Sequence, residues 1–300
     1  MLKIRLLRLF IALLGLTCAA QAHAQGTGEQ AGNDAVRLEH DELRNDLGRA
    51  LQSATGKEDA PIVPAPYVPT WSVVGTLSPL YTNNAFQTPD GARSDVYFEP
   101  DISLRLDGRL APSTSYRFYA RSDFSAFARL NDANSSLARF GLRLAQDISD
   151  WQLAASYENR LAFDGVFEGQ PRIANDLQAT LARNFAYGRL IVAPLVRARQ
   201  RFSEIPEARR FRLDLAVALE YGLGPKWALV SRPFYEMNWF EAGLNAGRRD
   251  AYYSVDIGLR YQISDGLNLT TSIVNEIRNS NVRGRDFNMI EIGPSLDFVF

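Results

Sequence analysis

Cysteine and histidine are almost absent from this chain. Its 300 residues include one cysteine, Cys18, and two histidines, His23 and His40. A disulfide needs two cysteines, and zinc sites are built mainly from cysteine and histidine, so we expect no disulfide and no metal site. A Ser-His-acid apparatus needs a histidine beside its nucleophile, and none follows His40. The sequence therefore predicts a protein without a cofactor that is not an enzyme.

Long apolar runs and lysines are scarce as well. No run of roughly 18 apolar residues, the length that a transmembrane helix needs, occurs after the N-terminal segment. Lys3, Lys57 and Lys226 are the only lysines, so arginine supplies nearly all of the positive charge. The formal net charge of -1 gives no basic footprint for a nucleic-acid partner. The planar guanidinium group of arginine suits close ion pairing and contacts with anions in a confined space.

The N-terminus has the pattern of a secretory signal peptide. A basic stretch at residues 1–8 precedes an apolar stretch at residues 9–16, and Ala22-His23-Ala24 fits a cleavage site. Residues 1–24 are therefore predicted to be removed, and Cys18 leaves with them. The mature chain is expected to begin at Gln25.

Two segments precede the main body of the chain. Residues 25–60 are predicted to contain an amphipathic helix, with an apolar stripe across residues 33–53. The stripe needs another copy of the chain, a partner protein or the rest of this chain to cover it; otherwise the helix is marginal and frayed. Residues 61–69 hold four prolines and are predicted to form a stiff, extended linker.

From residue 70 onward, apolar and polar residues alternate with the period of a β-strand. Segments of about ten residues repeat this pattern, which is typical of transmembrane barrel strands. We predict twelve strands, at 70–81, 94–107, 114–127, 136–146, 151–161, 174–184, 189–200, 209–222, 227–240, 250–263, 267–279 and 287–300. Short connectors follow the even strands, and longer ones, such as 82–93 and 162–173, follow the odd strands. Pro100, Pro194, Pro233 and Pro294 fall inside predicted strands, where we expect bulges or misplaced boundaries.

The final segment, residues 287–300, carries the most specific pattern. Ile290, Ile292, Leu296, Phe298 and Phe300 share one parity, and acidic or small residues share the other. A strand that ends the chain on an aromatic residue resembles the C-terminal strand of bacterial outer-membrane β-barrel proteins. In that family the terminal Phe is an assembly signal. The resemblance implies contact with outer-membrane lipids and the barrel-assembly machinery, and it places residues 25–60 in the periplasm.

Short turns and longer outer loops fit the same class, so the sequence predicts an all-β, up-and-down antiparallel transmembrane barrel over residues 70–300. Aromatic residues of such barrels gather at the two membrane interfaces. Trp71, Trp151 and Trp227 open upward strands and Trp239 ends one, so all four are predicted girdle residues. The missing barrel histidines separate the chain from the outer-membrane phospholipase, the omptin proteases and the lipid A deacylases.

The charged residues that alternate with the apolar ones along each strand are predicted to line the lumen and to form the functional site. Arginines dominate the third to eighth strands, and carboxylates dominate the others. The predicted lumen residues are Arg117, Arg121, Arg139, Arg143, Arg160, Arg197, Arg199, Arg210, Arg212, Glu99, Asp101, Asp256, Glu276 and Glu291. Opposed charges across a bore set a transverse field, as charged rings do in pores. Alternatively, the charges pair with one another and plug the barrel.

An arginine-rich, twelve-stranded lumen is similar to that of small acidic-sugar porins of the oligogalacturonate type. This resemblance implies a channel for small anionic solutes. A second interpretation remains open: a non-enzymatic outer-membrane component of a polysaccharide export or envelope-assembly system. In that case residues 33–53 contact a periplasmic partner and the barrel passes a polymer.

Overall fold

The computed structural model describes residues 67–300. The predicted signal peptide (1–24), the predicted helix (25–60) and the linker as far as residue 66 lie outside the described residues. Across 67–300 the chain is built almost wholly of antiparallel strands. No helix in this range is long and apolar enough to cross a membrane.

The strands follow one another in a single sheet. Their bounds are β1 (Thr70–Thr82), β2 (Asp95–Ala111), β3 (Thr114–Phe127), β4 (Ser135–Ile148), β5 (Trp151–Asp164), β6 (Glu168–Arg183), β7 (Phe185–Tyr187), β8 (Leu190–Ser203), β9 (Arg210–Gly222), β10 (Trp227–Ser231), β11 (Phe234–Phe240), β12 (Arg249–Ser264), β13 (Leu267–Ser280) and β14 (Phe287–Val299). Three short 3-10 helices lie in loops: η1 (Asn131–Ala133), η2 (Pro206–Ala208) and η3 (Gly243–Asn245).

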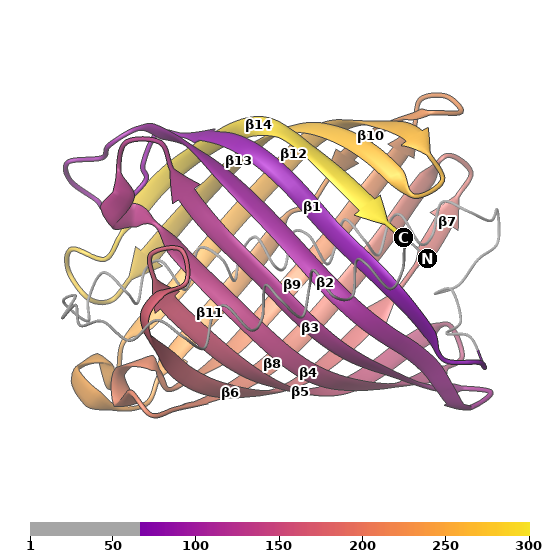
Figure 1. Cartoon of the computed structure of the whole chain (residues 1–300), viewed down its shortest axis with the longest axis horizontal. Coiled ribbons are helices and arrows are strands. Elements are labelled where there is room, and N and C mark those ends of the chain that lie inside the picture. The colour runs from indigo at the N-terminus through magenta and orange to yellow at the C-terminus, as the bar shows by residue number, and fades with distance from the viewer. Residues whose placement is uncertain (1–66) are drawn as a thin grey trace.

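These fourteen segments form a closed barrel of twelve strands. β6 and β7 pair with β8 in one register, and β10 and β11 lie end to end between β9 and β12. Each pair is therefore one strand of the wall with a local break. β14 pairs with β1 and closes the sheet into the tilted cylinder of Figure 1. The predicted fold class, an antiparallel up-and-down barrel of twelve strands, is confirmed.

The two ends of the barrel differ. Tight turns, such as residues 112–113, 149–150 and 265–266, lie at the end that also holds the C-terminus (Figure 1). The longer loops at the opposite end include residues 83–94 and the three that carry η1, η2 and η3. The long connector predicted at 162–173 is wrong, because β5 and β6 extend into it and leave only residues 165–167 as a turn.

Local chemistry explains that short turn. Gly165 and Phe167 both adopt positive φ angles, of 79° and 57°, which let the chain reverse tightly. The Ser136 hydroxyl accepts a bond from the Phe167 amide at 2.7 Å and donates to the Gly165 carbonyl at 3.0 Å. The Phe167 ring packs edge-on against Phe163, with centroids 5.6 Å apart. These contacts support two strands that project beyond their predicted ends.

The prolines interrupt hydrogen bonding and do not shift the register. Pro233 separates β10 from β11, yet both segments keep one alignment with β9. The bulges expected at Pro100, Pro194 and Pro294 are absent, since the register continues unchanged past each of them. A proline lacks only its own N–H, so the ladder loses a bond locally while the side-chain alternation is preserved. Register shifts occur elsewhere, between Ala162 and Asp164 for example.

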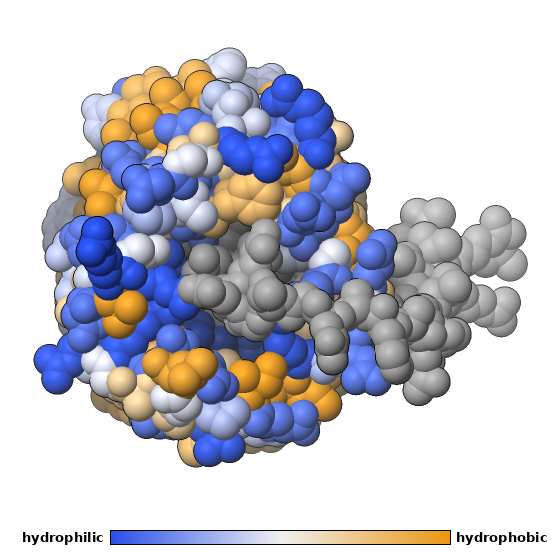
Figure 2. All heavy atoms as spheres, turned by 90° about the vertical axis from the view of Figure 1, so that its left-hand side faces the viewer, coloured by the Kyte–Doolittle hydropathy of each residue, from blue (hydrophilic) through white to orange (hydrophobic). Residues whose placement is uncertain are grey.

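Alternation along each strand separates an apolar outer wall from a charged interior. On β9, Leu215 is 43% exposed, whereas its neighbour Asp214 is fully buried. On β12, Ile257 is 55% exposed and its neighbour Asp256 is 1% exposed. Figure 2, which faces the long-loop end, shows hydrophilic residues around the mouth and apolar residues on the flank. A soluble barrel has the opposite arrangement, so this is the arrangement of a barrel that faces lipid.

Contacts on both faces hold the closing seam between β1 and β14. The Val73 and Phe300 backbones exchange two hydrogen bonds, of 2.8 and 2.9 Å. Outside, the Phe298 ring lies over Gly75, where a Cβ would come within 2.6 Å of the ring. Inside, the Thr76 hydroxyl donates to Asp297 at 2.8 Å. The terminal strand is therefore fixed by backbone, apolar and polar contacts together.

Candidate functional site

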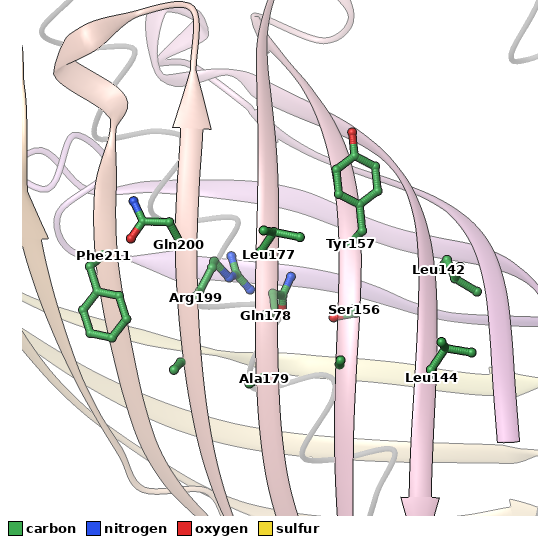
Figure 3. A pocket seen from close by; sticks show the side chains of 12 residues that line it. Leu142, Leu144, Ser156, Tyr157, Leu177, Gln178, Ala179, Arg199, Gln200 and Phe211 are labelled. Atoms are coloured by element: carbon green, nitrogen blue, oxygen red, sulfur yellow. The ribbon is translucent and has the colours of Figure 1, made fainter. Parts of the chain in front are cut away.

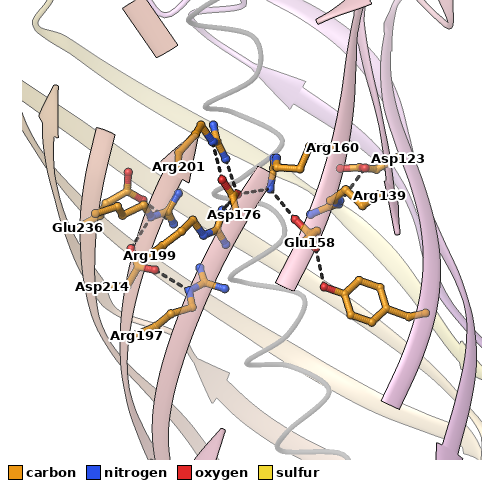
Figure 4. Close-up of polar contacts among 12 residues, drawn as sticks. Asp123, Arg139, Glu158, Arg160, Asp176, Arg197, Arg199, Arg201, Asp214 and Glu236 are labelled. Carbon is orange, nitrogen blue, oxygen red and sulfur yellow. Dashed lines mark hydrogen bonds and ion pairs between the residues drawn. The ribbon is translucent and has the colours of Figure 1, made fainter. Parts of the chain in front are cut away.

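A band of paired charges crosses the inner wall from β3 to β11 (Figure 4). We call it the arginine belt, and its members lie on alternate, inward-facing positions of their strands. It consists of Arg139, Arg160, Arg197, Arg199, Arg201 and Arg212 with Asp123, Glu158, Asp176, Asp214 and Glu236. All eleven side chains are almost fully buried. Buried charges persist only when an opposite charge compensates them, and each of these side chains lies within ion-pair distance of one.

Asp176 on β6 is the centre of the belt. Arg201 contacts it through two parallel bonds, each 2.8 Å long. Arg160 on β5 and Arg199 on β8 each place a guanidinium nitrogen 3.5 Å from the same carboxylate. Three guanidinium groups thus converge on one carboxylate, and with Glu158 beside Arg160 this region of the wall holds three cations and two anions.

Asp214 forms a second junction on β9. Arg197 and Arg212 approach its two oxygens separately, each at 2.6 Å. Arg212 also reaches Glu236 on β11 at 2.7 Å, and Asn238 donates to Glu236. Each arginine is therefore held by carboxylates from its own or a neighbouring strand, which limits side-chain motion and fixes the planes of the guanidinium groups.

Tyr119 ties three strands together at the other end of the belt. Its ring lies over Gly141 on β4, where a Cβ would come within 2.3 Å of the ring. Its hydroxyl donates to Glu158 on β5 at 2.7 Å, and Glu158 accepts a bond from Arg160 at 2.9 Å. The glycine is needed here because any side chain would displace the tyrosine that orients Glu158.

The remaining predicted arginines lie outside the central belt. Arg121 makes a two-bond pair with Asp101, at 2.6 and 2.7 Å, next to the belt on β2 and β3. Arg117 pairs with Asp107 and is 35% exposed, whereas Arg143 donates to Gln152. Arg210 lies against the Phe240 ring. The structure therefore places Arg117 and Arg143 apart from the densest part of the site.

The predicted carboxylates are dispersed over the other half of the wall. Glu99 accepts a bond from Ser125, and Glu291 accepts one from the Tyr97 hydroxyl at 2.6 Å. Asp256 pairs with Arg232, and Glu276 is 1% exposed. These residues form separate contacts and do not converge on one point.

Sequence reasoning missed Arg201, the strongest partner of Asp176. The predicted strand ended at residue 200, although Arg201 has the same parity as Arg197 and Arg199 and is the next inward position. Reasoning from charge alone also missed Tyr97, Tyr119 and Tyr252, which face inward among the charges. Tyr252 accepts a bond from Arg278 at 3.2 Å.

The lumen is not charged throughout. Toward the short-turn end, Ala193, Ala216, Ala218 and Phe234 form a buried apolar cluster with Ile191 and Leu195 against it. These residues occupy inward positions on β8, β9 and β11. The apolar cluster thus separates the belt from the buried ion pair of Glu220 and Arg260, which lies nearer the short-turn end.

The predicted girdle residues lie on the outer wall. Trp71, Trp151 and Trp227 are exposed near the short turns. Trp239 packs on Phe211 at 5.5 Å near the long-loop end. Within residues 67–300, no cluster of three or more metal-ligating side chains is present.

Comparisons with known proteins give no family. No family model matches the chain, and no curated protein matches it. Among solved structures, it is similar to the translocator domain of autotransporter NalP from Neisseria meningitidis, with 11% identity, TM-score 0.45, and coverage of 90% of this chain and 99% of that one.

Two porin structures are similar to a comparable degree. An anion-selective porin from Comamonas acidovorans shows 7% identity and TM-score 0.43, covering 77% of this chain and 99% of its own. The KdgM porin in complex with disordered oligogalacturonate shows 10% identity and TM-score 0.39, covering 75% and 99%. Such identities and scores are too low to transfer the activity of these proteins to this chain.

Proposed function

We propose that the protein is a channel in the outer membrane of a Gram-negative bacterium that passes small anionic, hydrophilic solutes. Support for the membrane placement comes from the exposed apolar residues on the outer wall and the paired charges inside. Support for the charge preference comes from one observation, the three arginines around Asp176. An anion that enters meets more guanidinium groups than carboxylates there, and a guanidinium group holds a carboxylate through two parallel bonds.

The belt accounts for selectivity by its fixed geometry. Guanidinium groups held by Asp176 and Asp214 are already oriented, so contact with a passing carboxylate costs little further ordering of these side chains. The field of the belt also raises the local concentration of anions and lowers that of cations. The apolar cluster toward the short-turn end offers no competing charge.

Planar-bilayer recording of the refolded protein tests this proposal. We expect the wild-type reversal potential in a salt gradient to indicate anion preference. The double variant Arg199→Gln/Arg201→Gln should shift it toward cations. Arg183→Gln is the matched control, because Arg183 pairs with Asp150 near the exposed short turns and not in the belt.

Three results overturn the proposal in different ways. Cation preference in the wild type rejects the anionic solute. A silent wild type whose double variant conducts shows that the belt seals the barrel. Silence in both, with heat-modifiable migration intact, means that the barrel is a scaffold.

A further inference from the structure

A hollow is present on the outer wall, away from the charged lumen. It has a volume of about 520 Å³ and lies over β4, β5, β6, β8 and β9. Leu142, Leu144, Tyr157, Leu177 and Phe211 stand around it in Figure 3. All five occupy outward positions of their strands, so the hollow faces the surroundings of the barrel.

Three alanines produce this hollow. Ala155 pairs with Ala179, and Ala179 pairs with Ala198, so the three lie side by side on neighbouring strands. Leu144 and Leu213 are the next outward residues at the two ends of this row. Small side chains between large ones leave a trough one side chain deep. Ser156, Gln178 and Arg199 alternate toward the lumen, so only their backbones contribute to the floor.

Polar groups lie at the long-loop side of the trough. The Tyr157 hydroxyl and the Asn159 amide both donate to the side-chain oxygen of Asn175, at 2.6 and 3.0 Å. This arrangement leaves the Asn175 amide nitrogen to donate to a ligand. Gln200, which pairs with Phe211 beside Trp239, donates to Glu241 in the loop. The trough is therefore apolar along most of its length and has a polar end near the aromatic pair of Phe211 and Trp239.

We propose that this trough binds one acyl chain of a membrane lipid, with a carbonyl of the lipid at Asn175. The proposal rests on the placement of the barrel in a membrane, but not on conduction through its lumen. An ester carbonyl only accepts hydrogen bonds, which suits the amide donor. A flexible chain fills a narrow trough, whereas a second barrel is convex and touches such a wall only along a line.

Selectivity for this position needs a reason beyond apolarity, because lipid tails and leucine side chains are similarly apolar inside a bilayer. The trough supplies two. A chain lying over the alanine row contacts floor and sides together, which increases its dispersion contacts. A hydrogen bond at the end of the trough fixes the position of the chain along it.

Native mass spectrometry of the full-length protein, released from nanodiscs of palmitoyl-oleoyl phosphatidylethanolamine, tests the site. Ala179→Phe fills the trough, and we expect it to lower the lipid-bound fraction about tenfold. Ala120→Phe adds the same bulk at an outward alanine on β3, outside the trough. The control should retain lipid as the wild type does.

Retention of lipid by Ala179→Phe at the wild-type level overturns the proposal, as does a wild type that carries no lipid. A wild-type dimer that dissociates on Ala179→Phe assigns the trough to a second copy and overturns it too. Flotation of proteoliposomes tests membrane placement separately, and bilayer recording tests conduction separately. Failure of the lipid site is therefore distinguishable from failure of the channel.

Discussion

Tyr119 shows how one side chain connects the wall of the barrel to its charged interior. The ring occupies the space above Gly141, and the hydroxyl reaches Glu158 one strand further. Glu158 in turn contacts Arg160, whose other partner is Asp176. A backbone position without a side chain thus determines how a carboxylate in the belt is oriented.

Gly141→Ala should destabilise the barrel by about 1–3 kcal/mol, because the new methyl group displaces the Tyr119 ring. Urea unfolding in liposomes, followed by tryptophan fluorescence, measures the change. Gly222→Ala is the control, since a Cβ there meets nothing closer than 3.8 Å. In a Tyr119→Ala background the cost of Gly141→Ala should largely disappear. An unchanged cost there would show that the clash with Tyr119 is not the cause.

At the scale of the strand, β14 combines an alternation of apolar and polar residues with closure of the barrel against β1. Its outward residues were evident from the sequence, and the predicted up-and-down barrel implied pairing with the first strand, but the register of that pairing was not predicted. Phe300 contributes two backbone bonds to Val73, and its ring stacks with Phe298 at 5.5 Å. Its role as an assembly signal stays a prediction.

Deleting Phe300 should remove both of those bonds, at about 1 kcal/mol each, together with the ring contact. We expect less folded barrel in the outer membrane, measured as heat-modifiable protein on gels. Phe300→Tyr retains the backbone bonds and an aromatic ring, so it should assemble at near wild-type level. Normal assembly of the deletion would contradict a role for the terminal residue.

Strand ends were harder to predict than strand identities. The alternation that defines β5 and β6 weakens at Gly165 and Gly169, so the sequence suggested a long loop there. The hydrogen bonds that hold the short turn come from Ser136 on β4, and the Phe167 ring packs in a tertiary contact. The sequence of β5 and β6 shows neither. Pro194 and Pro294 similarly suggested bulges, whereas neighbours on both sides hold the register through them.

For the whole molecule, the apolar wall sets the position in the bilayer. Leu215 is outward and central on β9, so Leu215→Arg should destabilise by about 2–4 kcal/mol. Ser272→Arg is the lumen-side control, because Ser272 lies inward between Gly258 and Gly293, where little side-chain bulk is present. Unfolding in liposomes should show a much smaller loss for the control. Equal losses would reject the assignment of the two faces.

Parity alone predicted which residues share the inner face, because the alternation continues past Pro100, Pro194, Pro233 and Pro294. It did not predict which charges pair. Whether Arg160 meets Asp176 depends on the stagger between β5 and β6, which places Glu158 opposite Asp176. Nor did it predict the apolar inner cluster. Ala216 and Ala218 occupy inward positions of a strand whose other inward residues are charged, and two alanines do not by themselves indicate a packed apolar region.

The meeting of Val73 and Phe300 has a consequence for chain topology. Because Thr70 and the C-terminus lie at the same end, a short peptide can join them while the chain is reopened in the loop at 83–94. Such a circular permutant keeps every strand between its present neighbours and keeps the Phe300 ring on Phe298. Compared with a barrel that begins at Thr70, the permutant differs in the loop opening and in the status of Phe300 as a terminus. It therefore separates the packing role of this residue from its predicted role as an assembly signal.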